Sequence, residues 1–325
     1  MSEKTPAFQI DAVIPWVNGN DKKWQEKLNH YLTVKIDFTN KKESVRFNSI
    51  GEIDIAIKSI IKYAPFFKNI YLITDDQQPE AFESLKALGK SSGINLELID
   101  HKVLFKGYEE FLPCFNSCSI ESLLFNIPKL SEHFVLFNDD FFIMRDANVT
   151  DFFTNGKPII RGNWKTFNED RMYRKMYHNL LASMGKYVPK KGISYKELQQ
   201  NGAKLAGTDK YIRRFHSPYP IRKSTIAAFF KNYDVKNNIQ YRFRDKNQFI
   251  ICSLSDHLEI KKNTYDFQKN TKLSYFRSYK NHLVVMLKLF WFDINKNKVF
   301  MTFQSLEMAD NKTQSYILNW LHKKL

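Results

Sequence analysis

The amino-acid sequence predicts an α/β protein built on a mostly parallel β-sheet flanked by helices. Segments of β-type pattern alternate with helical segments over the first half of the chain, as in right-handed βαβ units. Hydrophobic residues make up 43% of the 325 residues and aromatic residues 15%, so the chain can bury a large core. Only 11 Gly and 10 Pro are present, which is few for a loop-dominated β-propeller. This composition also excludes a disordered tail and a collagen-like fibre.

The first elements carry short local signals. A strand is expected at 10–15, and the Trp-Val-Asn-Gly sequence after it is typical of a turn. A helix is expected from residue 50, where Ser49 and Glu52 form a capping box and isoleucines recur on one face. Pro65 ends this helix.

The remaining elements follow in order, less regularly in the second half. Further strands are expected at 69–74, 95–99, 133–137 and 158–160, and helices at 79–88, 119–125, 169–183, 224–233 and 312–325. We expect the last helix to pack on the core, with contact to anionic lipid as the alternative. The expected organisation is a ligand-binding α/β core at 1–155, an inserted basic linker or lid at 156–210, and a segment at 211–325 that completes the same domain.

Charge and cysteine content restrict the partners. Lys and Arg number 50 against 34 Asp and Glu, a net charge of +16 that favours anionic ligands such as nucleotides, acidic lipids or nucleic acid. The basic residues are dispersed and form no nucleic-acid-binding motif, so no nucleic acid is expected. Cys114, Cys118 and Cys252 are expected to be buried, reduced thiols. Because the sequence has no long apolar run and no apolar signal core near its start, we expect a cytoplasmic protein.

An acidic rim follows the predicted strands. Parallel strands place their carboxyl ends at one edge of the sheet, where ligands bind. Asp139 and Asp140 lie between Phe137 and Phe141, where paired carboxylates are costly unless something neutralises them. We therefore predict a divalent cation held there against a pyrophosphate. For the other acidic residues an ordinary turn or N-cap role is the alternative. The residues of this rim are Asn18, Asp75, Asp76, Asp100, His101, Asp139 and Asp140.

A histidine and an arginine pair stand out in the second half. His216 lies between Arg213-Arg214 and Arg222-Lys223, surroundings that favour a neutral imidazole able to deprotonate an alcohol. Arg242 or Arg244 could grip phosphoryl oxygens in bidentate fashion. Neither a P-loop nor a G-x-G-x-x-G, G-x-S-x-G or H-E-x-x-H motif occurs. A metal, a base and an arginine together indicate phosphoryl transfer.

The same segments resemble the Stealth family, which includes bacterial capsular polysaccharide phosphotransferases and the animal N-acetylglucosamine-1-phosphotransferase. The family's first block, Ile-Asp-x-Val-x-x-Trp-Val-Asn-Gly, matches 10–19, and the second runs from Arg46-Phe47-Asn48 to Phe137-Asn138-Asp139-Asp140. The third matches His216-Ser217-Pro218 and, further on, Arg242 with Gln248-Phe249. The chain departs from the pattern at Asp76, where the family usually has Gly. The fourth block looks degenerate or truncated, with Gln304-Ser305 at the expected Asn-Asp pair.

The resemblance implies a Rossmann-like sheet of glycosyltransferase-A type and a divalent metal, Mg²⁺ or Mn²⁺. It implies transfer of a hexose 1-phosphate from a nucleotide-sugar donor, most simply a UDP-sugar, to a hydroxyl of a glycan or phosphoglycan acceptor. The product would be a phosphodiester in a capsule or other cell-surface polysaccharide. The resemblance is also compatible with peripheral association with a capsule assembly complex at the inner face of the cytoplasmic membrane.

The family's functional residues carry over by matching position. Asp139 and Asp140 would hold the metal, and Asp140, His216 and Arg242 would be catalytic. The donor-binding set would be Asp11, Trp16, Asn18, Gly19, Arg46, Asn48, Lys58, Asp75, Asn116, Ser117 and Glu121. Two alternatives stay open: a conventional metal-dependent glycosyltransferase, and a nucleic-acid-binding protein that only the charge suggests.

Overall fold

The centre of the molecule is a five-stranded sheet of order β10-β4-β1-β2-β3. The computed structural model describes residues 8–40, 43, 50–170, 176, 180, 181, 183, 184 and 193–325. Four strands are parallel, and β10 pairs with β4 in the antiparallel sense. The predicted mostly parallel α/β sheet is therefore confirmed. The strands are β1 (Ile10–Pro15), β2 (Phe67–Thr74), β3 (Asn95–Asp100), β4 (His133–Leu136) and β10 (Tyr219–Arg222).

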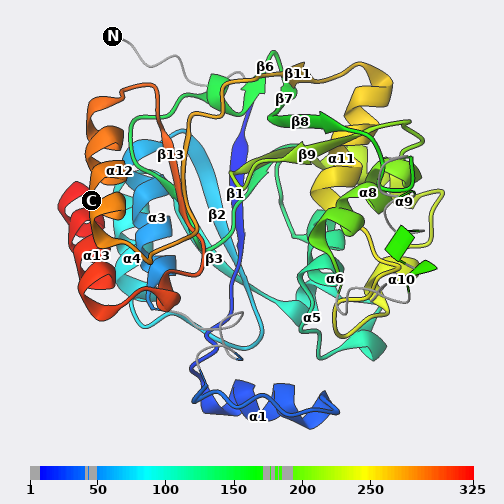
Figure 1. Cartoon of the computed structure of the whole chain (residues 1–325), viewed down its shortest axis with the longest axis horizontal. Helices are drawn as coiled ribbons and strands as arrows, with labels where there is room; N and C mark the ends of the chain where they lie inside the picture. The colour runs from blue at the N-terminus through cyan, green and yellow to red at the C-terminus, as the bar shows by residue number, and fades with distance from the viewer. Residues whose placement is uncertain are drawn as a thin grey trace.

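Helices lie on both sides of the central strands (Figure 1). One group is α3 (Glu52–Tyr63), α4 (Phe82–Ser91), α12 (His282–Ile294) and α13 (Asn311–Lys324). The other is α5 (His101–Leu104), α6 (Ser117–Ser122), α8 (Tyr195–Leu205), α9 (Lys223–Phe230), α10 (Lys236–Ile239) and α11 (Ile251–Lys262). Helix α1 (Lys22–Tyr31) lies apart, below the carboxyl end of β1.

Three small sheets complete the fold. In the first, β13 (Phe300–Phe303) lies between β12 (Leu273–Phe276) and β5 (Phe141–Ile143). The second has the order β11-β7-β6, with β6 (Phe153–Thr154), β7 (Lys157–Ile160) and β11 (Asp266–Phe267), and the third pairs β8 (Gly162–Lys165) with β9 (Tyr211–Arg214). Short 3₁₀ turns occupy Glu109–Phe111, Leu124–Asn126, Val149–Asp151 and Leu306–Met308. Because β5 begins directly after Asp140, its pairing with β13 fixes the acidic loop that follows β4.

The core explains why the early elements are read easily from sequence. Ile10, Ala12, Val13 and Ile14 of β1 are fully buried, as expected for a strand covered on both faces. Helix α3 turns its isoleucines to the same core, and its N-cap is Gly51 at φ 87°, a left-handed conformation that favours glycine. The Glu52 carboxylate accepts from the backbone N–H of Ile50 at 2.7 Å. Ser49, the other half of the predicted capping box, lies outside the described residues.

The later elements match the prediction less well. Helix α8 occupies 195–205, where a linker or lid was expected, and most of the helix predicted at 169–183 lies outside the described residues. Helix α13 buries Thr313, Ile317 and Leu321, which confirms that it packs on the core.

All three cysteines are buried and free, as expected. In the described part of the chain, no helix is both long and apolar enough to cross a membrane. The proposed domain boundaries stay a prediction.

Candidate functional site

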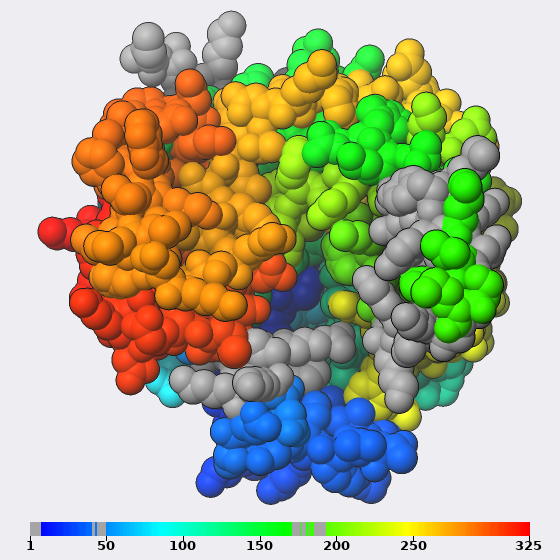
Figure 2. Space-filling model, viewed as in Figure 1, coloured from blue at the N-terminus to red at the C-terminus, as the bar shows by residue number. Residues whose placement is uncertain are grey.

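A cavity of about 290 Å³ opens at the carboxyl ends of β1 and β4. Its floor is formed by Pro15, Trp16 and Val17 after β1 and by Asn138 and Asp139 after β4. Figure 2 shows the hollow in the middle of this face, with N-terminal residues deep inside it. The strand order reverses between β1 and β4, because β2 and β3 extend to one side of β1 and β4 lies on the other. Ligands of open α/β sheets bind at such a switch point.

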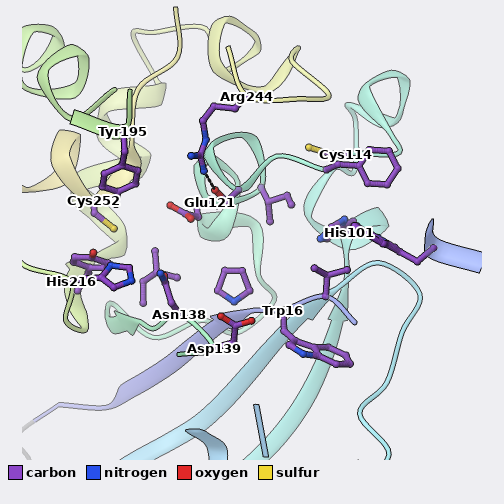
Figure 3. Close-up of a pocket in the computed structure, with 18 residues that line it drawn as sticks. Trp16, His101, Cys114, Glu121, Asn138, Asp139, Tyr195, His216, Arg244 and Cys252 are labelled. Carbon is purple, nitrogen blue, oxygen red and sulfur yellow. Dashed lines mark hydrogen bonds between the residues drawn. The ribbon is translucent and has the colours of Figure 1, made fainter. Parts of the chain in front are cut away.

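The walls of the cavity come from segments far apart in the chain (Figure 3). Arg244 and Glu121 lie across the cavity from Asp139, and His216 lies along a side with Tyr195 and Cys252. The remaining lining residues are Trp24, His101, Cys114, Phe115, Ser117, Ile120, Leu136 and Tyr219. Trp24, Cys114, Tyr195 and Cys252 had no sequence signal as site residues, because each is an isolated apolar or aromatic position.

His216 and Asp140 are hydrogen-bonded, with 3.2 Å between Nε2 and Oδ2. Strand β13 holds both residues: the Thr302 hydroxyl donates to the His216 carbonyl at 3.0 Å, and the backbone N–H of Phe303 donates to the Asp140 carbonyl at 3.4 Å. The imidazole also meets the edge of the Phe141 ring, with centroids 4.7 Å apart. The base candidate and its carboxylate therefore have a fixed relative position.

The charges around His216 differ from those expected from sequence. Arg214 is buried and pairs with Asp256 at 2.6 Å, and Arg222 pairs with Glu259 at 2.5 Å. Both arginines therefore have carboxylate partners of their own. The charged group that contacts the imidazole is the Asp140 carboxylate, at 3.2 Å from Nε2.

Carboxylates crowd the loop after β4. Burial raises the pKa of Asp139 well above its usual range, and the negative charges of Asp140, Glu52 and Glu307 raise it further. Burial likewise raises the pKa of Glu52, with a smaller contribution from Asp140. From the sequence, Glu52 was assigned to a capping box, and neither Glu52 nor Glu307 was expected near Asp139 and Asp140. Helix α3 brings Glu52 close to the acidic pair, and the turn after β13 brings Glu307 there. Local sequence does not reveal these contacts between distant segments.

The acidic pair fits a divalent cation shared with a phosphate ligand. The Oδ1 atom of Asp140 is buried and has no hydrogen-bond partner among the described residues. Oxygen ligands suit Mg²⁺ and Mn²⁺, and Mg²⁺ is commonly held by one or two carboxylates together with substrate phosphates. Among the described residues, no group of three His, Cys, Asp or Glu side chains is placed to hold an ion. Asp139 and Asp140 therefore suit an ion that a bound pyrophosphate helps to coordinate.

The two candidate arginines have different environments. Arg242 donates to the carbonyls of Pro113 at 2.8 Å and Leu112 at 3.2 Å, and its guanidinium lies 4.2 Å from the centre of the Tyr31 ring. Arg244 lines the cavity and donates to the Ser117 hydroxyl at 3.1 Å. Its Nε is buried and has no hydrogen-bond partner in the described part of the chain. Arg244 is therefore the arginine that a ligand in the cavity could contact, whereas the family resemblance implied Arg242 as the catalytic arginine.

This difference gives a testable prediction. Arg244→Ala is expected to lower kcat by about 10²–10³-fold, because it removes a charged donor from the cavity. Arg242→Ala is expected to act mainly on stability, by about 2 kcal/mol, because it removes hydrogen bonds to two carbonyls. Steady-state kinetics and urea unfolding measure the two effects. Exposed Arg277→Ala is the matched control. A larger kcat loss in Arg242→Ala than in Arg244→Ala would reverse the assignment.

Glu121 stands beside Arg244 on the same wall. Burial raises the pKa of its carboxyl to about 7, and the Arg244 charge opposes this rise. The group therefore changes charge near neutral pH, which is the range required of an acid or base in a cavity. Trp16, Ser117 and Glu121 are the members of the predicted donor-binding set that line the cavity.

The other predicted donor-binding residues brace the structure around the cavity. Asn116 is fully buried, caps α6 and donates to Gln248 Oε1 at 2.8 Å, linking the second and third sequence blocks. The backbone N–H of Asn18 donates to Gln77 Oε1 at 2.8 Å, and Asp75 pairs with Lys27 at 2.7 Å.

Further residues of the set lie away from the lining or outside the description. Asp11 is at the amino end of β1, where its carboxylate accepts from Asn69 Nδ2 at 2.8 Å and from the backbone N–H of Ser131 at 2.7 Å. The Gly19 carbonyl accepts from Gln25, and Lys58 lies on α3 outside the cavity lining. Arg46 and Asn48 lie outside the described residues.

Comparison with known proteins places these features in a family. The model of Stealth protein CR1, conserved region 1, matches residues 8–33, and that of Stealth protein CR2, conserved region 2, matches residues 46–160. The capsular polysaccharide phosphotransferase fcs1 of Haemophilus influenzae is 34% identical over 253 residues, which cover 75% of this chain and 63% of the relative. The exopolysaccharide phosphotransferase cps2G of Lactiplantibacillus plantarum is 39% identical over 147 residues, or 45% of this chain and 40% of the relative. The chain thus spans less than two thirds of either relative.

A shorter relative is covered more fully. The capsular polysaccharide phosphotransferase eps5J of Streptococcus thermophilus is 31% identical over 200 residues, which cover 60% of this chain and 77% of the relative. Among solved structures, one of the galactosyltransferase LgtC in complex with donor and acceptor sugar analogs matches over 96% of this chain and 95% of the LgtC chain. The sequence identity is 12% and the TM-score is 0.43. That structural likeness is too weak to carry an argument. On the sequence matches, this chain belongs to the Stealth protein family.

Proposed function

We propose that the protein transfers a sugar 1-phosphate from a nucleotide-sugar donor to a hydroxyl of a glycan acceptor, as a hexose-1-phosphate transferase of capsule or exopolysaccharide synthesis. The observation that carries this proposal is the His216–Asp140 pair next to the carboxylate cluster, with the Arg244 guanidinium across the cavity. The names of the relatives, capsular and exopolysaccharide phosphotransferases, support it. The donor type, the acceptor and the linkage are part of the proposal.

His216 acts as the base toward the acceptor hydroxyl. Its Nε2 faces the Asp140 carboxylate, so a neutral imidazole with its proton on Nε2 donates to Asp140 and leaves Nδ1 to accept a proton. Asp140 orients the ring and stabilises the imidazolium that forms. The second carboxylate oxygen, Oδ1, stays available for a cation.

Asp139 and Asp140 are the residues that would hold the divalent metal. When bound, such an ion supplies Lewis-acid neutralisation of the pyrophosphate oxygens. Attack by the acceptor oxygen at the β-phosphorus forms the new P–O bond, breaks the bond to the bridging oxygen and releases nucleoside monophosphate. Charge then spreads over the equatorial phosphoryl oxygens, and the Arg244 guanidinium donates two hydrogen bonds to them.

The competing reaction is ordinary glycosyl transfer. There the acceptor oxygen attacks the sugar carbon, and nucleoside diphosphate leaves. A base together with an arginine favours attack at phosphorus, because an arginine fork matches phosphoryl oxygens.

The nucleotide product distinguishes the two reactions. The purified chain is incubated with Mg²⁺ or Mn²⁺, a panel of nucleotide-sugars and soluble capsule-type glycans, with Asp140→Asn as the inactive control. We expect nucleoside monophosphate in step with a phosphodiester signal in ³¹P NMR. Nucleoside diphosphate without a phosphodiester would establish the glycosyltransferase alternative instead.

A further inference from the structure

Helix α12 exposes an apolar face. Its buried residues Val285, Leu289 and Phe292 belong to a hydrophobic cluster that also contains Phe276, Phe303 and Ile317. The opposite side carries large apolar side chains, and Figure 1 places the helix at the outer edge of the molecule. The exposed fractions are 67% for Leu283, 47% for Val284, 57% for Leu287, 57% for Phe290, 63% for Trp291 and 52% for Ile294. A contiguous exposed apolar face of this kind marks an interaction surface.

Basic residues surround this face. Lys288 is exposed within it, Lys280 precedes the helix and Lys296 follows it. Asp293, the single acidic residue of the helix sequence, is paired with Lys324 at 2.7 Å. The surroundings of the apolar face are therefore cationic, in keeping with the net charge of +16.

A small cavity adjoins the same face. It has a volume of about 170 Å³ and lies between α12 and β12, with Lys288, Trp291 and Lys298 among its lining residues. Two lysines beside a tryptophan provide the chemistry for an anionic group at the boundary between a polar and an apolar phase.

We propose that α12 binds the surface of a bilayer that contains anionic lipids, with its apolar face in the acyl boundary and Lys288 and Lys298 at a lipid phosphate. The helix has 13 residues, too few to span a membrane but suited to lying in the interface. An apolar face with tryptophan and flanking lysines is the composition of interfacial helices. The cations at both ends of the face favour an anionic bilayer over a protein partner, because each lysine near such a surface adds attraction.

The position of α12 relates this surface to the cavity. Lys288 Nζ donates to the Tyr275 carbonyl at 3.5 Å, and the Tyr275 ring lies 5.8 Å from the His216 ring between centroids. Figure 2 shows the α12 region on the same face as the hollow. The α12 surface and the cavity are therefore connected through Tyr275. The lipid-binding inference itself does not depend on the reaction.

Vesicle flotation of the full chain tests the apolar part. We expect the wild-type chain to float with vesicles of phosphatidylcholine and phosphatidylglycerol and to remain below vesicles of phosphatidylcholine alone. The variant Leu287→Gln/Phe290→Gln/Trp291→Gln should bind at least tenfold more weakly and keep its melting temperature, because these side chains are exposed. The matched control replaces apolar residues exposed elsewhere: Val34→Gln/Leu88→Gln/Leu205→Gln.

A second set tests the cations. Lys288→Gln/Lys296→Gln/Lys298→Gln should weaken binding to the anionic vesicles by roughly fivefold per lysine, and added salt should reduce the difference. Lys90→Gln/Lys102→Gln/Lys261→Gln, exposed on other helices, is the control for net charge and should bind much more tightly than the first lysine variant. The proposal is overturned if the wild-type chain does not float, if the α12 apolar variant floats as well as wild type, or if each control loses as much binding as its counterpart.

Discussion

Asp140→Asn is expected to lower kcat by roughly 10⁴-fold while the protein remains as stable as wild type or becomes more stable. The substitution removes the carboxylate that orients His216 and one of the two that would hold a cation. It also removes a negative charge that raises the pKa values of Asp139 and Glu52. Activity is therefore expected to fall without a loss of stability. Kinetics with the soluble acceptor and thermal melting measure them on the same preparations.

Two controls make this result specific. Exposed Asp146→Asn changes the same chemical group close by in sequence and should keep full activity. Addition of Mg²⁺ or Mn²⁺ should raise the melting temperature of the wild-type chain more than that of Asp140→Asn, since only wild type retains both carboxylates. An Asp140→Asn protein that keeps a tenth of wild-type activity, or that melts well below wild type, would contradict this role.

The second large effect is expected at His216. His216→Ala should lower kcat by about 10³–10⁴-fold and leave the dissociation constant of the nucleotide-sugar nearly unchanged, because a base acts on the acceptor and not on the donor. Isothermal titration with donor and single-turnover kinetics separate the two quantities.

The alternative is a purely structural role for His216, whose carbonyl accepts from Thr302. A structural role would make His216→Ala lower the melting temperature and donor affinity together, and His216→Gln would restore activity. Exposed His322→Ala is the matched control and should behave as wild type.

The parts of the fold that local pattern governs could be predicted from sequence. Strand β1 is read from a buried apolar run, α3 from its isoleucine stripe, and the location of the cavity from the rule that parallel strands end at one edge. Asp139 and Asp140 were noticeable because two carboxylates stand in an aromatic segment. In each case a few adjacent residues contain the signal.

The remainder depends on contacts between distant segments. Helix α11 buries Asp256, His257 and Glu259, which are satisfied by Arg214, the backbone N–H of Ile212 and Arg222. Nothing in the local sequence marks such polar residues as buried, so this helix was not predicted. The role of Arg242 could not be predicted for the same reason. Its guanidinium donates to the carbonyls of Leu112 and Pro113, which are far from it in the sequence, and this leaves Arg244 to line the cavity.

The pairing of β5 with β13 has a consequence for how the protein is made on the ribosome. Strands β1, β2 and β3 can pair as they emerge, but β4 gains its outer neighbour only with β10, and β5 gains its neighbour only with β13. The Tyr63 hydroxyl also donates to the carbonyl of Lys324 at 2.5 Å, which connects α3 to the end of α13. A nascent chain that stops before β13 therefore presents the unpaired edge of Phe141–Ile143, an aggregation-prone strand. Activity should appear only after synthesis has passed residue 303, and interrupted synthesis should yield chaperone-bound or aggregated fragments.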